Sequence, residues 1–143
     1  MAMTFPALGV SEKEPIALWR TAQKEPSCSL YAFVKGYWSR LKLFDASGME
    51  WAVAEAVPTR PCSQLAKWLA PICYNPIITV TLRFEKPRHY TVDRLRQLVC
   101  QAIDHDEDIM TQFVEADALK AHVQATTSLA DLIAVLIDSH AIE

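Results

Sequence analysis

Apolar and polar residues alternate over residues 78–85, and this is the clearest pattern in the chain. Every second position is apolar, and the positions between are polar or charged; the apolar ones are Ile78, Val80, Leu82 and Phe84. Strict alternation predicts a strand with one buried face and one solvated face, which is typical of an antiparallel sheet.

Further strands are predicted upstream of this segment. Residues 30–38 (LYAFVKGYW) are rich in aromatic residues, which favours a strand. Alternation continues after them as far as residues 45–48 (DASG), where Asp and Gly supply turn chemistry. The pattern therefore predicts a hairpin that closes at residues 45–48. Pro58 and Pro61 are expected to end this part of the sheet, because proline donates no backbone hydrogen bond.

Apolar residues at helical spacing predict four helices. The first covers residues 62–70 and stops before a proline. The second follows Thr91 as its N-cap and presents one apolar stripe as far as Ile103. A short helix is expected around residues 116–123, and a last one begins after Ser128. Strands come early and helices late, so we expect an α+β fold. In it, an antiparallel sheet of about four strands packs against several helices concentrated in the C-terminal half.

The sequence of the N-terminal segment, residues 1–29, does not decide between several secondary structures. Ser11-x-x-Glu14 followed by Pro15 has the form of a helix start, but the apolar residues after it suit a strand or a packed arm equally well. We therefore expect an N-terminal arm or helix over residues 1–29. The whole chain of 143 residues is expected to form one domain, residues 1–143.

Composition narrows the class of protein. Hydrophobic residues make up 51% and charged residues 22%, as in globular domains, and the net charge of −3 disfavours a dedicated nucleic-acid binder. The four cysteines form no CxxC pair, so we expect reduced, buried thiols and no zinc site or other cofactor. No segment resembles a signal peptide, and no apolar run reaches the roughly 18 residues of a membrane span. These features predict a soluble, cytoplasmic domain.

Charge is segregated along the second half of the chain. Residues 83–96 carry five Lys or Arg, whereas residues 104–117 carry six Asp or Glu and no Lys or Arg. Such an acidic stretch produces a local negative field suited to steering a basic partner. An alternative interpretation is that several of these acids cap a helix beginning near Ile109, where the helix dipole favours negative charge.

The sequence gives less support to a metal site or to nucleophilic catalysis than to a partner-binding acidic segment. Asp104, His105 and Asp108 would share a face of a helix, but they lack the spacing of a calcium loop, and a solvated face is favoured over a metal site. A cysteine paired with His89 or His140 would be needed for nucleophilic catalysis, and no local motif marks such a pair.

Several segments resemble one family of bacterial proteins. They are residues 31–43 (YAFVKGYWSRLKL) with the Phe44-Asp45 and Trp51 that follow, residues 75–80 (NPIITV) and residues 104–113 (DHDEDIMTQF). Together they resemble the immunity proteins of polymorphic toxins, including contact-dependent growth inhibition (CDI) systems, over about residues 30 to 138. The resemblance implies a cytoplasmic, non-enzymatic inhibitor that binds one cognate toxin domain, often a nuclease.

Nuclease clefts are basic because they hold phosphates, so carboxylates are the expected contact groups of such an inhibitor. The candidate partner-binding residues are Asp104, Asp106, Glu107, Asp108, Gln112, Glu115 and Asp117. We expect no binding to nucleic acid or membrane. The alternatives are a small cytoplasmic enzyme or ligand-binding domain, with a pocket between sheet and helices, and a structural subunit of a stable assembly.

Overall fold

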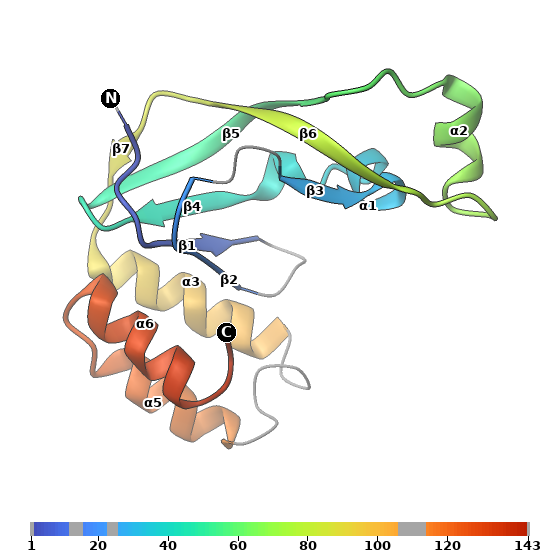
Figure 1. Cartoon of the computed structure of the whole chain (residues 1–143). Coiled ribbons are helices and arrows are strands. Elements are labelled where there is room, and N and C mark those ends of the chain that lie inside the picture. The colour runs from blue at the N-terminus through green and yellow to red at the C-terminus, as the bar shows by residue number, and fades with distance from the viewer. Residues whose placement is uncertain (1, 12–15, 23–25, 106–113, 143) are drawn as a thin grey trace.

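The computed structural model describes residues 2–11, 16–22, 26–105 and 114–142. These residues form an α+β fold (Figure 1). Its strands are β1 (Ala7–Val10), β2 (Ala17–Trp19), β3 (Ser27–Ser29), β4 (Lys42–Asp45), β5 (Met49–Pro58), β6 (Ile77–Phe84) and β7 (Arg88–His89). Its helices are α1 (Leu30–Val34), the 3-10 turn η1 (Trp38–Arg40), α2 (Gln64–Leu69), α3 (Val92–His105), α5 (Ala116–Gln124) and α6 (Leu129–Asp138).

All the strands pair antiparallel in one curled sheet, with the order β2-β1-β4-β5-β6-β3 and with β7 beside β5. The register of β5 against β6 shifts between Val53 and Glu55, and an irregularity of this kind bends a strand. Helices α3, α5 and α6 lie together beside β1 and β2, whereas α2 lies at the far end of β5 and β6 (Figure 1). The sheet, the C-terminal helices and α2 thus occupy three parts of the molecule.

The sheet is larger than the sequence pattern predicts. The described residues form seven strands rather than about four, and β1, β2, β3 and β7 are the unexpected ones. Each of these four is too short for alternation to identify. The N-terminal segment therefore contributes three strands, β1 to β3, where we had expected an arm or a helix and had left a strand open for the residues after Pro15, which hold β2.

The predicted strand over residues 30–38 is wrong, because this segment forms α1 and the start of η1. Ser29 caps α1, and its hydroxyl accepts a hydrogen bond from the Ala32 N–H at 3.2 Å. The N–H of Tyr31 donates to Asn75 Oδ1 at 2.8 Å, which gives a second free amide of the first turn a partner. Because α1 and α2 both precede β6, the helices are not confined to the C-terminal half.

The local predictions elsewhere are confirmed. The hairpin closes at residues 45–48, with Gly48 at φ 87°. Strand β5 ends at Pro58. Ser128 caps α6 through its hydroxyl, and the Thr91 hydroxyl accepts from the Arg94 N–H at 3.3 Å. Ser63 caps α2 in the same way, which was not predicted. Each of these signals depends on neighbouring residues alone.

Strands β1 and β4 are buried on both faces, because their successive residues enter two different cores. Leu8 and Phe44 pack with α3, α5 and α6, whereas their neighbours Ala7 and Leu43 pack with the opposite core. That second core contains Trp19, Trp38, Trp51 and Val80, with the predicted apolar face of β6 packed against it. The first core holds the sheet and the helical layer together.

Candidate functional site

The acidic segment, residues 104–117, is the predicted partner-binding site, and the structure describes both of its ends. Asp104 lies in the last turn of α3, and Glu115 and Asp117 lie at the start of α5. All three are exposed. Asp106, Glu107, Asp108 and Gln112 lie outside the described residues, as does the helix start expected near Ile109. The structure thus brings the two ends of the segment to neighbouring helices.

Within the part of the chain that the structure describes, Lys120 is the one cation paired with the acids of this segment. Its Nζ lies 2.6 Å from Asp104 Oδ1 and 3.9 Å from Asp117 Oδ1. The hydrogen bond with Asp104 is the main reason that the pKa of Lys120 is raised. One ammonium therefore faces two carboxylates at this end of α3 and α5, and negative charge remains in excess.

Helix capping does not account for Glu115 and Asp117. Glu115 occupies the N-cap position of α5, but its side chain makes no cap hydrogen bond. Asp117 lies in the first turn, where the helix dipole favours a carboxylate, and its side chain is 99% exposed. Both residues are exposed, and among the described residues the one contact found for their carboxylates is the 3.9 Å ion pair of Asp117 with Lys120.

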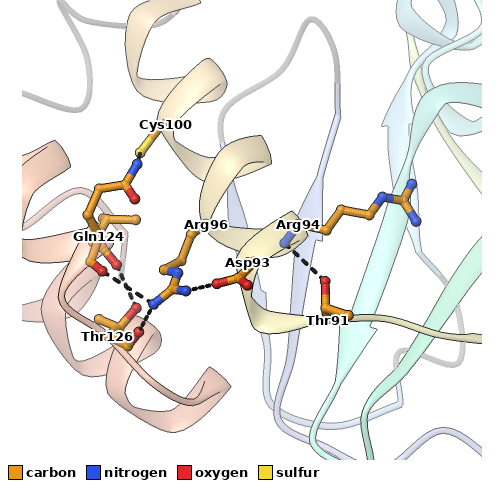
Figure 2. A network of polar contacts seen from close by, with 8 residues as sticks. Thr91, Asp93, Arg94, Arg96, Cys100, Gln124 and Thr126 are labelled. Atoms are coloured by element: carbon orange, nitrogen blue, oxygen red, sulfur yellow. Dashed lines mark hydrogen bonds and ion pairs between the residues drawn. The ribbon is translucent and has the colours of Figure 1, made fainter.

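Part of the basic segment, residues 83–96, is by contrast used inside the molecule. Arg94 Nη1 lies 2.5 Å from Glu50 Oε2, and Arg83 Nη1 lies 3.3 Å from Glu55 Oε2. Figure 2 shows Arg96 of α3 paired with Asp93 and donating to the carbonyls of Gln124 and Thr126. Arg96 thereby links α3 to the connection between α5 and α6. Arg94 and Arg96 therefore act as structural cations, whereas the pair of Arg83 and Glu55 lies at the surface, with side chains that are 74% and 54% exposed.

The thiols show no sign of a nucleophile. Burial raises the pKa of Cys28 and of Cys100, although Trp38 Nε1 donates to Cys28 Sγ at 3.2 Å and Gln124 Nε2 to Cys100 Sγ at 3.5 Å. A raised pKa leaves less thiolate at neutral pH. The prediction of four buried thiols is wrong for Cys73, which is exposed, and the other three are half-buried.

A second surface, which the sequence analysis did not predict, lies around α2. We call it the apolar end and define it by its exposed large side chains: Val57, Leu65, Trp68, Ile72, Tyr74 and Ile77. Exposure of Trp68 is 66% and that of Ile77 is 71%. A cavity of about 660 Å³ opens beside them between α2 and β6. An exposed apolar surface of this kind commonly marks an interaction site.

The lack of negatively charged residues in one part of the sequence could have indicated the apolar end. Residues 56–84 include Arg60, Lys67 and Arg83 but no Asp or Glu. Periodicity placed Leu65 and Trp68 in a helix over residues 62–70, but it does not show whether their face is buried.

Among the described residues, no three His, Cys, Asp or Glu side chains gather as metal ligands would. Across the same ranges, every helix is too short or too polar to cross a membrane. Comparison of the chain with protein families, with curated proteins and with solved structures gives no significant match. Function therefore has to be argued from the residues themselves.

Proposed function

We propose that this chain is an immunity protein, which binds and neutralises a cognate antibacterial toxin domain in bacterial competition of the contact-dependent growth inhibition type. The observation that carries the proposal is the exposure of Glu115 and Asp117, which end a segment whose sequence contains four further acids. The resemblance of residues 30–138 to such inhibitors supports the same class of protein.

In this proposal the acidic segment takes the place of nucleic acid on a basic toxin surface. A nuclease holds phosphates with Arg and Lys, and carboxylates offered by an inhibitor form charge-assisted hydrogen bonds with the same groups. The field of the segment also accelerates encounter, since opposite charges steer association over roughly 8 Å at physiological salt. Inhibition then needs no chemical step by this chain.

The test begins with the partner. The open reading frame next to the gene of this chain is expected to encode a large secreted protein with a variable C-terminal domain. That domain, expressed alone, should stop bacterial growth, and co-expression of this chain should restore growth. If the isolated domain is toxic and this chain neither binds it nor protects cells, the inhibitor proposal is wrong.

The binding surface is tested by charge reversal. Glu115→Lys with Asp117→Lys should weaken toxin binding by about tenfold or more at low salt, mainly through slower association, and should flatten its salt dependence. The same change at Asp106 and Asp108 should act in the same direction.

The matched control is Glu55→Lys with Glu85→Lys. It changes net charge by the same amount on exposed carboxylates of β5 and of the chain just after β6. This control should leave the association rate close to that of the unaltered protein. Equal effects of the two pairs would show that net charge, and not the acidic segment, governs binding.

A further inference from the structure

A cavity of about 280 Å³ lies between the sheet and α3. Its apolar wall consists of Val10 and Phe44 from the sheet and Leu98 and Ala102 from α3. Three of these four residues, Val10, Phe44 and Ala102, are themselves buried in the core between sheet and helices. The volume is near the lower end of the range for small-molecule pockets, and the apolar wall is typical of them.

The polar lining of this cavity has one chemical character. It consists of Ser11, Arg40, Lys42, Gln101 and His105. Each of these side chains can donate hydrogen bonds, and two of them are permanently cationic at neutral pH. No carboxylate is present among the described residues that line it. Such a cavity offers hydrogen-bond donors and positive charge but no negatively charged side chain among its described residues, so it is complementary to an anion.

Ser11 adds an independent observation. It is 7% exposed, and within the part of the chain that the structure describes its Oγ is the only buried side-chain nitrogen or oxygen without a hydrogen-bond partner. A buried hydroxyl without a partner destabilises the folded state, so its presence at this cavity needs a reason. A ligand oxygen at hydrogen-bond distance would supply the missing partner.

Arg40, the last residue of η1, has a guanidinium that is available to a ligand. The residue is half-buried, and within the described ranges its guanidinium forms neither an ion pair nor a hydrogen bond. The ammonium of Lys42 is shared with Glu50, whose Oε1 lies 3.6 Å away. Arg40 is therefore the stronger candidate for a bidentate contact with a carboxylate or phosphate.

From this geometry we infer that the cavity between β1, β4 and α3 binds a small organic anion, a carboxylate or phosphate attached to a compact apolar body. The anionic group contacts Arg40, Lys42 and Ser11. The apolar body packs against Phe44 and Leu98. The C-terminal carbonyls of α3 lie toward His105, and their partial negative charge keeps the anionic group on the sheet side of the cavity.

This site does not depend on the proposed inhibitor function. Its lining residues are different from the seven proposed partner contacts, although His105 is next to Asp104 in sequence. The ligand experiment uses the isolated chain and no toxin. Failure of the ligand experiment therefore leaves the inhibitor proposal standing, and the reverse also holds.

The probes are benzoate, phenyl phosphate, inorganic phosphate and the neutral benzamide, each titrated at millimolar concentration into isotope-labelled protein. Benzoate or phenyl phosphate should shift the amide signals of Ser11, Arg40 and Gln101 in a saturable manner. The preferred one of the two identifies the head group. Benzamide should bind at least about tenfold more weakly, because it lacks the charge that Arg40 recognises.

Two substitutions and a control identify the contacts. Arg40→Gln should weaken binding of the preferred anion about tenfold or more, whereas Arg88→Gln removes an equal charge outside the cavity and should leave binding unchanged. Ser11→Ala should raise the melting temperature of the free protein and weaken anion binding at the same time. A serine with a purely structural role would not show this opposed pair of effects.

Saturable shifts at the cavity that are lost with Arg40→Gln support the site. The inference is overturned if neither organic anion shifts these amides, if benzamide binds as well as benzoate, or if only inorganic phosphate binds. It is also overturned if binding survives Arg40→Gln. If Arg40→Gln fails to fold, two results still test the site. They are the amide shifts of the unaltered protein and the combination of a raised melting temperature with weakened anion binding in Ser11→Ala.

Discussion

Helices α3 and α2 both have apolar residues at helical spacing, yet the structure uses them in opposite ways. In α3 the apolar stripe is buried, with Leu95 and Val99 fully enclosed between the sheet, α5 and α6. In α2 no residue is buried, and Leu65 is 64% exposed and Trp68 66%. Periodicity tells which residues share a face of a helix, but what lies opposite that face is decided by the rest of the fold.

The helical layer of α3, α5 and α6 therefore differs from α2 in what its apolar residues contribute. The helical layer stabilises the molecule by removing apolar surface from water, while α2 leaves its apolar side chains exposed. A helix as short as α2, without buried residues, gains little from tertiary packing and is expected to open locally. The two regions should therefore respond very differently to the same substitutions.

The largest difference is expected for a matched pair of leucines. Leu95→Ala in α3 should lower the free energy of unfolding by about 2–5 kcal/mol, because it removes a fully buried side chain and leaves a cavity. Leu65→Ala in α2 should change it by no more than about 0.5 kcal/mol, since that side chain is 64% exposed. Urea unfolding of the two variants measures both values, and equal losses would contradict the division between the regions.

Asp45, at the opposite end of the β4–β5 hairpin from α2, should give the next largest effect. Burial alone would raise its pKa, but hydrogen bonds to the carboxylate from Ser47, Trp51, Met49 and Thr4 together lower the pKa. Trp51 Nε1, for example, donates to Oδ2 at 2.9 Å. Asp45→Asn should cost about 1–3 kcal/mol at pH 7, because an amide NH₂ would face donors.

The pH dependence of this effect has a defined sign. Because the folded pKa of Asp45 lies below its ordinary value of 3.8, its contribution is present above that pH and is lost as pH falls through the folded pKa. The stability difference between Asp45→Asn and the unaltered protein should therefore shrink below about pH 4. A difference that stays constant down to about pH 2 would argue against the hydrogen-bonded carboxylate.

Two serine N-caps offer a finer comparison. Ser128 Oγ accepts from the Asp131 N–H of α6 at 3.1 Å, and Ser63 Oγ accepts from the Ala66 N–H of α2 at 3.1 Å. Ser128→Ala should lower global stability by about 0.5–2 kcal/mol. Ser63→Ala should leave global stability unchanged and accelerate amide exchange in α2 alone. Loss of global stability in both variants would mean that α2 is coupled to the core.

The smallest expected effect is spectroscopic. Trp19, Trp38 and Trp51 are each exposed by 8% or less, whereas Trp68 is 66% exposed. Iodide should therefore quench only part of the tryptophan fluorescence, and Trp68→Phe should remove that part without changing stability. If the quenched fraction survives this substitution, α2 is covered in solution.

Features that depend on neighbouring residues could be predicted from the sequence. The turn at residues 45–48, the cap at Ser128 and the alternation in β6 are of this kind, and each is confirmed. The segment 30–34 was mistaken for a strand, although Ser29 caps its helix, and two of its first amides donate to Asn75 and Pro76 far along the chain. Long-range contacts of this sort leave no local pattern.

The candidate sites also differ in how far the sequence could predict them. Glu115 and Asp117 could be named as candidate contacts from their charge, and their exposure in the structure is compatible with that prediction. The cavity beside Ser11 and Arg40 was not predicted, because it forms only when β1, the end of η1 and α3 come together. Nothing in the residues next to Ser11 shows that its hydroxyl will be buried without a partner.

Amide hydrogen exchange of this chain, free and bound to the toxin domain from the neighbouring reading frame, tests the central claim most directly. The account predicts that the toxin slows exchange over residues 104–117 and the start of α5, and leaves α2 and residues 72–77 unchanged. Protection confined to α2 and residues 72–77, with residues 104–117 exchanging as in the free chain, would contradict it.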